Sequence, residues 1–299
     1  MLEDKTRFDD PHMESLLPQI KVNRRGFLAT GASVAGYTLA PGPVMAQSVI
    51  RTPADGVDVT DFRIPVDGGA YMPGYMAAPK KPGKYATILV VPEIFGMHEY
   101  QKDMCRRLAL AGYVGVTQDP FHRTGDLSKI TDIKETVGKA NQLTDANMKA
   151  DLDALVAWVS LQPKVNAAKL GITGMCRGGR TVWMYAAHSK KIKAGVAWYG
   201  QFNPRPPAAP QTPYDVAANL NAPVLGLYAG ADGGIPVEHV ARMQELLATG
   251  NKNAKASTFI LYPNVPHAFH ADYRPSYRKP EADAAWKEML DWFKKHGVA

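Results

Sequence analysis

Cysteine is scarce in this sequence, with only 2 among 299 residues. Two cysteines cannot build a disulfide-rich scaffold or a metal site of four thiolates. The sequence also lacks an H-E-x-x-H motif, a paired-cysteine motif and a Walker motif. We therefore expect no metal and no cofactor.

Clusters of one charge are missing as well. Lys and Arg number 35 against 28 Asp and Glu, which gives a formal net charge of +7, but the basic residues are scattered. This distribution argues against nucleic acid binding and is compatible with a small anionic ligand. Hydrophobic residues make up 45% of the chain and no repeat is present, which excludes disordered and collagen-like proteins.

Residues 1–46 have the pattern of an export signal rather than of a folded domain. Arg24-Arg25 precede an apolar stretch from residue 27 to about 40, which is shorter than the roughly 20 residues that span a bilayer. Small side chains follow, up to Ala46-Gln47. A charged start, a short apolar middle and a small-residue end predict a secretory signal peptide. An uncleaved apolar helix is the alternative.

The paired arginines resemble a twin-arginine signal, which an export machinery reads through residues 24–28. We expect cleavage near Ala46-Gln47, a periplasmic protein, and no stable membrane insertion after cleavage. Residues 47–57 then form a short extension before the folded domain.

The remainder of the chain, residues 58–299, predicts one α/β domain. Short apolar, β-branched runs alternate with segments of helical spacing, which favours βαβ units and a mainly parallel sheet flanked by helices. The expected strands are 86–91, 113–117, 170–173, 194–198, 223–228 and 258–262, and the expected helices are 100–111, 147–161, 181 onward, 236–248 and 281–295. Residues 58–77 combine Gly, Pro and alternating apolar residues, which predicts an antiparallel hairpin at the sheet edge. Ligands of such sheets bind where the strands end.

A nucleophile motif follows the strand at 170–173. Gly174-Met175-Cys176-Arg177-Gly178-Gly179 fits the pattern glycine, any residue, nucleophile, any residue, glycine, with Cys176 in the position usually held by serine. The nucleophile of such an elbow lies on a tight strand-to-helix turn, where side chains at Gly174 and Gly178 would collide. The following helix also favours the Cys176 thiolate. The alternative is a glycine-rich turn that contains a buried, inert cysteine.

Two further strand ends offer partners for Cys176. Asp232 follows the strand at 223–228, and His267 follows the last strand, in the order acid then histidine that this architecture requires. His267 would act as the base, and Asp232 would orient it. Each residue alone could be an ordinary loop residue, and His270 is a second candidate for the base.

The loop after the strand at 86–91 contains Glu93 and Ile94. In this architecture that loop supplies one backbone N–H of the oxyanion hole and the residue after the nucleophile supplies the other, which assigns them to Ile94 and Arg177. A carboxylate in such a mouth is costly unless it is paired or catalytic. The alternative for Glu93 is an exposed loop acid.

Together these motifs resemble the dienelactone hydrolase family, whose best-known member is carboxymethylenebutenolidase. The resemblance runs from about residue 58 to the C-terminus and rests on residues 92–96, 174–179, 231–232 and 267–269. It implies an α/β-hydrolase fold, a Cys-His-Asp triad, and hydrolysis of a lactone or small carboxylic ester (EC 3.1.1) through a thioester. It also implies that Glu93 interacts with the Cys176 thiol and helps to form the thiolate.

The resemblance is weaker for substrate binding. Family members that act on dienelactone hold its carboxylate with two arginines, and Arg123 matches the first. Ala271 stands where the second is expected, with Arg274 three residues further on. A solvated surface is the alternative for both arginines. Trp198 and Tyr199 follow a strand end and either line the substrate pocket or pack in the core.

The second cysteine, Cys105, lies in a predicted helix, which favours a buried, inert thiol. A non-catalytic binding protein for an anionic metabolite is the competing function, although a complete set of triad residues favours an enzyme.

Overall fold

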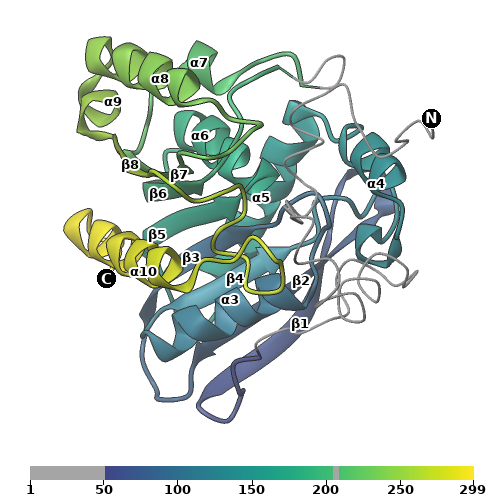
Figure 1. The fold of residues 1–299 in the computed structure, drawn as a ribbon. Helices are drawn as coiled ribbons and strands as arrows, with labels where there is room; N and C mark the ends of the chain where they lie inside the picture. Colours follow the sequence, from purple (N-terminus) through teal and green to yellow (C-terminus); the bar gives the residue numbers. More distant parts are fainter. Residues whose placement is uncertain (1–50, 205–208) are drawn as a thin grey trace, which may run out of the picture.

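The computed structural model describes residues 51–204 and 209–299, so the predicted signal peptide lies outside the described residues. An eight-stranded sheet has the order β1-β2-β4-β3-β5-β6-β7-β8 (Figure 1). Neighbouring strands from β4 to β8 pair in parallel, whereas β1–β2 and β2–β4 pair antiparallel. The predicted α/β fold with an antiparallel hairpin at the edge is confirmed. The strands are β1 Val57–Pro65, β2 Tyr71–Pro79, β3 Tyr85–Val91, β4 Val114–Gln118, β5 Val165–Met175, β6 Ile192–Trp198, β7 Val224–Ala229 and β8 Thr258–Tyr262.

Helices cover both faces of this sheet. On one face lie α3 and α10, and on the other α5 and α6 (Figure 1). The layers touch closely, because a Cβ atom on Gly115 of β4 would lie 2.6 Å from the Cα atom of Cys105 in α3. The helices are α3 Glu99–Leu110, α4 Ile133–Ala140, α5 Asp145–Ser160, α6 Arg177–His188, α7 Pro213–Val216, α8 Val237–Thr249, α9 Lys252–Ala256 and α10 Lys279–Lys295, with short 3-10 turns η1 Asp67–Gly69 and η2 Leu127–Lys129.

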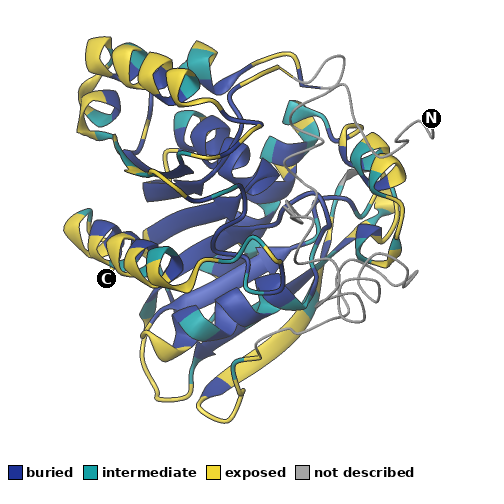
Figure 2. Cartoon of the chain, in the orientation of Figure 1, coloured by how far each residue is buried: buried dark blue, intermediate teal, exposed yellow. Residues whose placement is uncertain are grey.

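Burial follows from this layering. Strands β4 and β7 are buried at every residue, whereas the outer faces of α8 and α10 are exposed (Figure 2). Strands covered on both faces carry continuous apolar runs, which explains why they were predictable. None of the helices in the described ranges is long and apolar enough to cross a membrane.

Two element boundaries differ from the prediction by four residues or more. Strand β5 begins at Val165, five residues earlier than predicted, because residues 167–169 are exposed and interrupt the run of apolar, β-branched residues that marks a buried strand. Helix α6 begins at Arg177 rather than at 181, so Gly178 and Gly179 lie inside its first turn. Glycine has low helix propensity, and the close packing of this turn overrides it.

The strand order brings the predicted site together. Strand β3 lies between β4 and β5. The chain leaves β3 to form β4 on one side of it, and after β4 it crosses over to form β5 on the other side. Such a switch point leaves a crevice at the carboxyl ends of the strands. The loop after β3 carries Glu93, and Cys176 follows β5, so both lie at this crevice. Tyr199, Asp232 and His267 follow β6, β7 and β8 in turn.

Candidate active site

Cys176 occupies a strained turn between β5 and α6. Its φ of 54° and ψ of −115° lie where non-glycine residues are uncommon. The Cys176 N–H donates to the carbonyl oxygen of Trp198 at 3.0 Å, and its carbonyl accepts from the N–H of Arg180 at 3.1 Å. Such strain persists only where the surrounding structure fixes it, as these bonds do.

The flanking glycines allow this turn to fit against the rest of the protein. A Cβ atom on Gly174 would lie 2.5 Å from the carbonyl oxygen of Gly178, and one on Gly178 would lie 2.2 Å from that of Val91. The predicted need for glycine at both positions is confirmed. Because α6 begins at Arg177, Cys176 caps the helix and lies at the positive end of its dipole.

Asp232 and His267 form a buried hydrogen-bonded pair. His267 Nδ1 lies 2.6 Å from Asp232 Oδ2, and both side chains are 1% exposed. The other carboxylate oxygen of Asp232 accepts from the N–H of Gly234 at 2.9 Å. Burial opposes charge on His267, but attraction to Asp232 and to Cys176, together with the hydrogen bond to Asp232, raises the His267 pKa to about 10. Near neutral pH His267 therefore carries a proton beside Cys176.

His270, the second candidate for the base, has a different environment. Its Nδ1 lies 2.6 Å from the hydroxyl oxygen of Tyr100 in α3, and its ring centroid is 4.4 Å from that of Trp198. Burial, together with the charge of Arg107, lowers the His270 pKa to about 3, so the ring stays neutral. This geometry gives His270 a packing role and leaves His267 as the candidate residue for acid–base chemistry.

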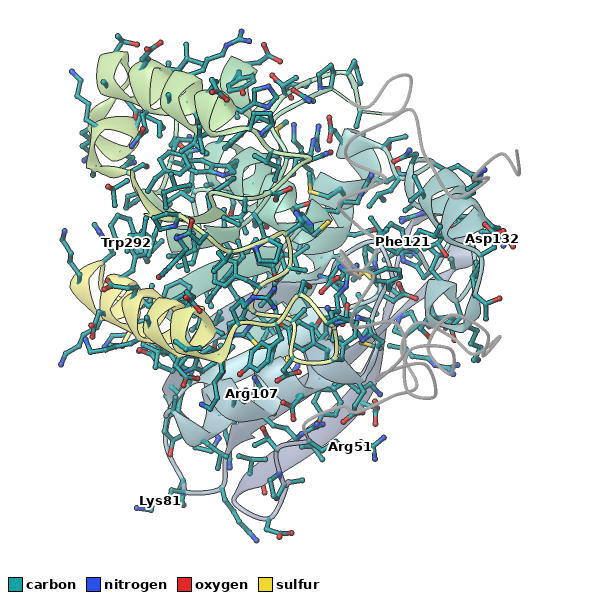
Figure 3. All side chains as sticks on the ribbon, viewed as in Figure 1. Arg51, Lys81, Arg107, Phe121, Asp132 and Trp292 are labelled. Carbon is teal, nitrogen blue, oxygen red and sulfur yellow. The ribbon has the colours of Figure 1, made fainter. Side chains whose placement is uncertain are left out.

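The loop that carries both histidines is anchored on α3. Arg107 extends from α3 toward this loop (Figure 3) and pairs with Asp272. The same guanidinium lies 2.6 Å from Asp103, whose side chain is fully buried. With the Tyr100–His270 bond, these contacts fix the loop after β8 against a rigid helix.

Glu93 is fully buried, so it is not an exposed loop acid. The Tyr273 hydroxyl donates to its Oε2 at 2.9 Å, while Oε1 has no hydrogen-bond partner among the described residues. Burial raises the Glu93 pKa, and Arg274, the Tyr273 hydrogen bond and His267 each act in the opposite direction. Tyr273 was missed in the sequence because one tyrosine in a loop gives no signal of its partner.

Arg274 lies near enough to Glu93 to interact with it electrostatically, although the second arginine was expected at the position that Ala271 holds. The Arg274 N–H donates to the carbonyl of Ala271, and the Ala271 N–H donates to that of Ala268, so successive turns wind the loop back toward the site. Its guanidinium carbon lies 5.8 Å from the ring centroid of Phe95, on the loop after β3.

Of the other predicted substrate contacts, Arg123 and Trp198 make structural contacts, whereas Tyr199 lies at the site. Both terminal nitrogens of Arg123 donate to the buried Asp151 of α5, at 2.6 and 2.8 Å, a pairing the sequence did not predict. Trp198 is buried and donates from Nε1 to Thr173 Oγ1 at 2.9 Å, inside the sheet. Tyr199 instead faces the site, with its ring centroid 5.0 Å from that of His267. The buried Tyr199 hydroxyl has no hydrogen-bond partner among the described residues.

The predicted oxyanion-hole residues border the same crevice. Arg177 is the first residue of α6 and directly follows Cys176, so its N–H lies at the start of the helix. Its guanidinium donates to the Leu143 carbonyl at 3.1 Å and to Asn141 at 3.2 Å, which braces the turn. Ile94 is buried in the loop after β3.

Cys105 does not belong to this site. It is a fully buried free thiol in α3, and burial raises its pKa, as expected for an inert cysteine. Among residues 51–204 and 209–299, no cluster of His, Cys, Asp and Glu could hold a metal ion.

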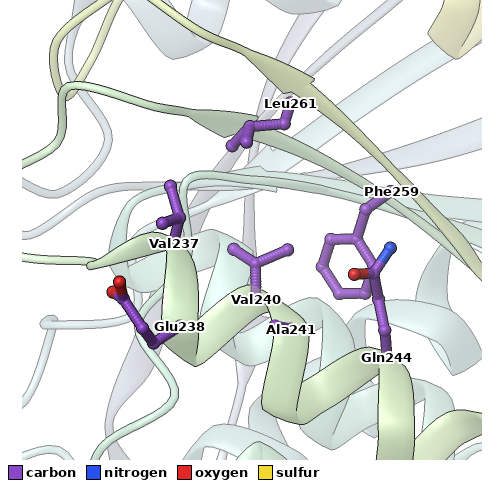
Figure 4. Close-up of a pocket in the computed structure, with 7 residues that line it drawn as sticks. All are labelled: Val237, Glu238, Val240, Ala241, Gln244, Phe259 and Leu261. Atoms are coloured by element: carbon purple, nitrogen blue, oxygen red, sulfur yellow. The ribbon is translucent and has the colours of Figure 1, made fainter.

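A shallow groove of about 420 Å³ lies elsewhere, between α8 and β8 (Figure 4). It contains no cysteine, serine or histidine, so it has none of the residue types that would supply the nucleophile and histidine of a triad. Its lining residues are Val237, Glu238, Val240, Ala241, Gln244, Phe259 and Leu261.

An eight-stranded, mostly parallel sheet with a strained nucleophile turn after β5 and an Asp-His pair at later strand ends defines an α/β-hydrolase. Residues 72–297 match the model of the dienelactone hydrolase family, and the chain belongs to this family. It is thus a carboxylic ester hydrolase of the carboxymethylenebutenolidase-like group (EC 3.1.1).

Individual relatives agree with this assignment. The chain is 47% identical over 292 residues to a "Putative carboxymethylenebutenolidase" of Methylorubrum extorquens, covering 97% of this chain and 99% of that protein. A protein of the same name from Escherichia coli K12 is 41% identical, covering 88% and 96%. The crystal structure of a "Putative Dienelactone Hydrolase" from Klebsiella pneumoniae superposes with a TM-score of 0.76 at 40% identity, covering 80% of this chain and 99% of that one.

Proposed function

We propose that the enzyme hydrolyses a lactone or small carboxylic ester through a thioester formed on Cys176. The observation that carries this proposal is the 2.6 Å contact between His267 Nδ1 and Asp232 Oδ2, next to a cysteine held at a nucleophile elbow. The name of the family supports a lactone as one substrate type.

In the first half-reaction the Cys176 thiol loses its proton and the sulfur attacks the ester carbonyl carbon. Because His267 already holds a proton near neutral pH, we assign the thiol proton to Glu93. The tetrahedral oxyanion would accept hydrogen bonds from the N–H groups of Ile94 and Arg177. Its collapse breaks the bond to the alkoxide, which takes the His267 proton and leaves as an alcohol.

In the second half-reaction His267, now neutral, takes a proton from water, and the hydroxide oxygen attacks the thioester. Collapse expels the sulfur, which recovers its proton from Glu93, and the acid product leaves and ionises in solvent. Asp232 holds the His267 ring in place and stabilises the imidazolium in both steps.

Substrate recognition is assigned to Arg274 and Tyr199. Arg274 supplies a buried positive charge beside Glu93, which suits an ester or lactone that carries a carboxylate. The unpartnered Tyr199 hydroxyl offers a hydrogen bond, and its ring offers an apolar wall.

The test is a panel of lactones and aryl esters, assayed with the wild type and with Cys176→Ala and His267→Ala. Both variants are expected to lose turnover. Cys176→Ala should keep the wild-type melting temperature, whereas His267→Ala should melt at a lower temperature because it leaves the buried Asp232 carboxylate without its cation. Full activity in folded Cys176→Ala would contradict the proposed nucleophile. A carboxylated substrate should lose more in kcat/KM than a neutral one in Arg274→Gln, because only the former needs the charge.

We also propose that residues 1–46 direct export, with recognition through residues 24–28 and cleavage near Ala46-Gln47. The proposal rests on the twin arginines and the small-residue site. Fractionation of cells that express the full chain, with Arg24→Lys/Arg25→Lys as the matched variant, tests it. N-terminal sequencing of the periplasmic protein should begin at Gln47, and equal export of the variant would contradict the proposal.

A further inference from the structure

Tyr273 lies where it can control the proton on Glu93. Its hydroxyl donates to Glu93 Oε2 at 2.9 Å across 180 positions of sequence, and both residues are buried. Oε1 of the same carboxyl has no hydrogen-bond partner among the described residues. Glu93 also interacts electrostatically with His267, which places this carboxyl group at the candidate site. Since buried polar atoms are normally paired, the unpaired Oε1 atom indicates a functional role.

Rigid neighbours hold Tyr273 in this position. Its ring centroid lies 5.1 Å from that of His98 and 5.2 Å from that of Tyr100. His98 caps α3, and its Nδ1 accepts from the N–H of Tyr100 at 3.4 Å, so both rings are attached to the start of one helix. The Tyr273 hydroxyl is therefore fixed by α3.

The direction of this hydrogen bond determines where Glu93 can carry a proton. Burial and the neighbouring Glu93 charge raise the Tyr273 pKa well above its ordinary value, so the hydroxyl keeps its proton and acts as the donor. Oε2 is then occupied as an acceptor. A proton added to Glu93 goes to Oε1, because a carbonyl oxygen at Oε2 accepts the Tyr273 hydrogen bond better than a hydroxyl oxygen at Oε2 would.

We propose that Tyr273 is a positioning residue that confines the exchangeable proton of Glu93 to Oε1 and so directs proton transfer from Cys176. This inference rests on the proposed function, in which Glu93 receives the thiol proton. The S–H bond of Cys176 breaks, an O–H bond forms at Oε1, and the electron pair stays on the sulfur.

The second consequence of the bond is a shift in the protonation of Glu93. A hydrogen bond to the charged carboxylate favours the ionised form, against the burial that favours the neutral one. The titratable and charged groups that face Glu93 are Tyr273, Arg274, His267, Tyr100 and Tyr199. The Tyr273 hydroxyl donates a hydrogen bond directly to the carboxyl group. A substitution to phenylalanine removes this hydroxyl without altering the charge of the site.

The test is the pH dependence of Cys176 alkylation by iodoacetamide and of kcat/KM in Tyr273→Phe. Loss of the hydrogen bond should move the acid limb of both profiles to higher pH by about one unit. At a pH on that limb the rate should fall roughly tenfold, while the plateau changes less. Tyr277→Phe, in the same loop, is the matched control and should leave both profiles in place. Should Tyr273→Phe not fold, Tyr273→Met, which also lacks the hydroxyl, replaces it.

Glu93→Gln separates the failure of this inference from the failure of the proposed function. The acid limb should be absent in Glu93→Gln, and Tyr273→Phe should add no shift to that variant. An acid limb that persists in Glu93→Gln overturns the proposed role of Glu93. The inference about Tyr273 fails on its own if the limb disappears in Glu93→Gln but folded Tyr273→Phe keeps the wild-type profile. It also fails if Tyr273→Phe shifts the profile by the same amount in the Glu93→Gln background.

Discussion

A Cβ atom added to Gly178 would lie 2.2 Å from the carbonyl oxygen of Val91. The turn that holds Cys176 after β5 is thus packed directly on the end of β3, where the loop with Glu93 begins. This backbone contact explains how the candidate nucleophile and the candidate oxyanion loop keep a fixed separation.

Gly178→Ala should therefore destabilise the enzyme and abolish activity. The new methyl group would meet backbone rather than a mobile side chain, so the turn has to shift. Gly138→Ala in α4 is the matched substitution, because a Cβ atom there meets nothing within 4 Å. It should stabilise the fold by about 0.5–1 kcal/mol, as expected when alanine replaces a helical glycine. Urea unfolding measures both, and a wild-type stability for Gly178→Ala would contradict the packing.

Asp232→Asn should lower kcat by roughly 10³- to 10⁴-fold without unfolding the protein. An amide keeps the size of the side chain but loses the charge that raises the His267 pKa. The control is Asp153→Asn. Asp153 Oδ2 pairs with His188 Nε2 at a similar distance, 2.7 Å, but this pair is far more exposed to solvent than Asp232 and His267. Steady-state hydrolysis of an aryl ester should fall in the first variant alone. Equal rates in both variants would remove Asp232 from the triad.

Stability should decrease as the pH rises from about 6.5 to about 10. The folded protein holds a proton on His267 up to about pH 10, whereas an unfolded histidine loses it near 6.5, so the folded state binds more protons in this window. His267→Asn should flatten that part of the curve of unfolding free energy against pH. The same slope in His267→Asn and wild type would contradict the raised pKa.

Arg123→Gln should cost about 3 kcal/mol, because it leaves the buried carboxylate of Asp151 without its cation. Asp151→Asn removes the same ion pair from the other side, and the double variant should be less destabilised than the sum of the single ones. Thermal unfolding of the four proteins measures this coupling. Additive losses would show that the two side chains do not stabilise each other.

Much of the fold could be predicted because it depends on local patterns. The interior strands carry continuous apolar runs, and the long helices carry a helical spacing with recognisable ends. Helices α4, α7 and α9 were not predicted, since they have only 8, 4 and 5 residues, too few turns for a helical pattern to stand out in the sequence.

The site divides in the same way. Cys176, Asp232 and His267 each follow a strand, so their positions could be predicted from the order of the elements alone. Tyr273 depends on how the loop after β8 lies against α3, which no local pattern specifies. Arg123 depends likewise on Asp151, a partner 28 positions away on a helix whose buried face cannot be assigned to one neighbour in advance.

The most direct test of the central claim is the mass of the enzyme shortly after it is mixed with an activated aryl ester. We predict an acyl group on the peptide that contains Cys176, labile to hydroxylamine, formed in wild type and absent in Cys176→Ala. Turnover with no acyl group on Cys176 in rapidly quenched samples, together with a Cys176→Ala variant that keeps the wild-type rate, would contradict the thioester mechanism.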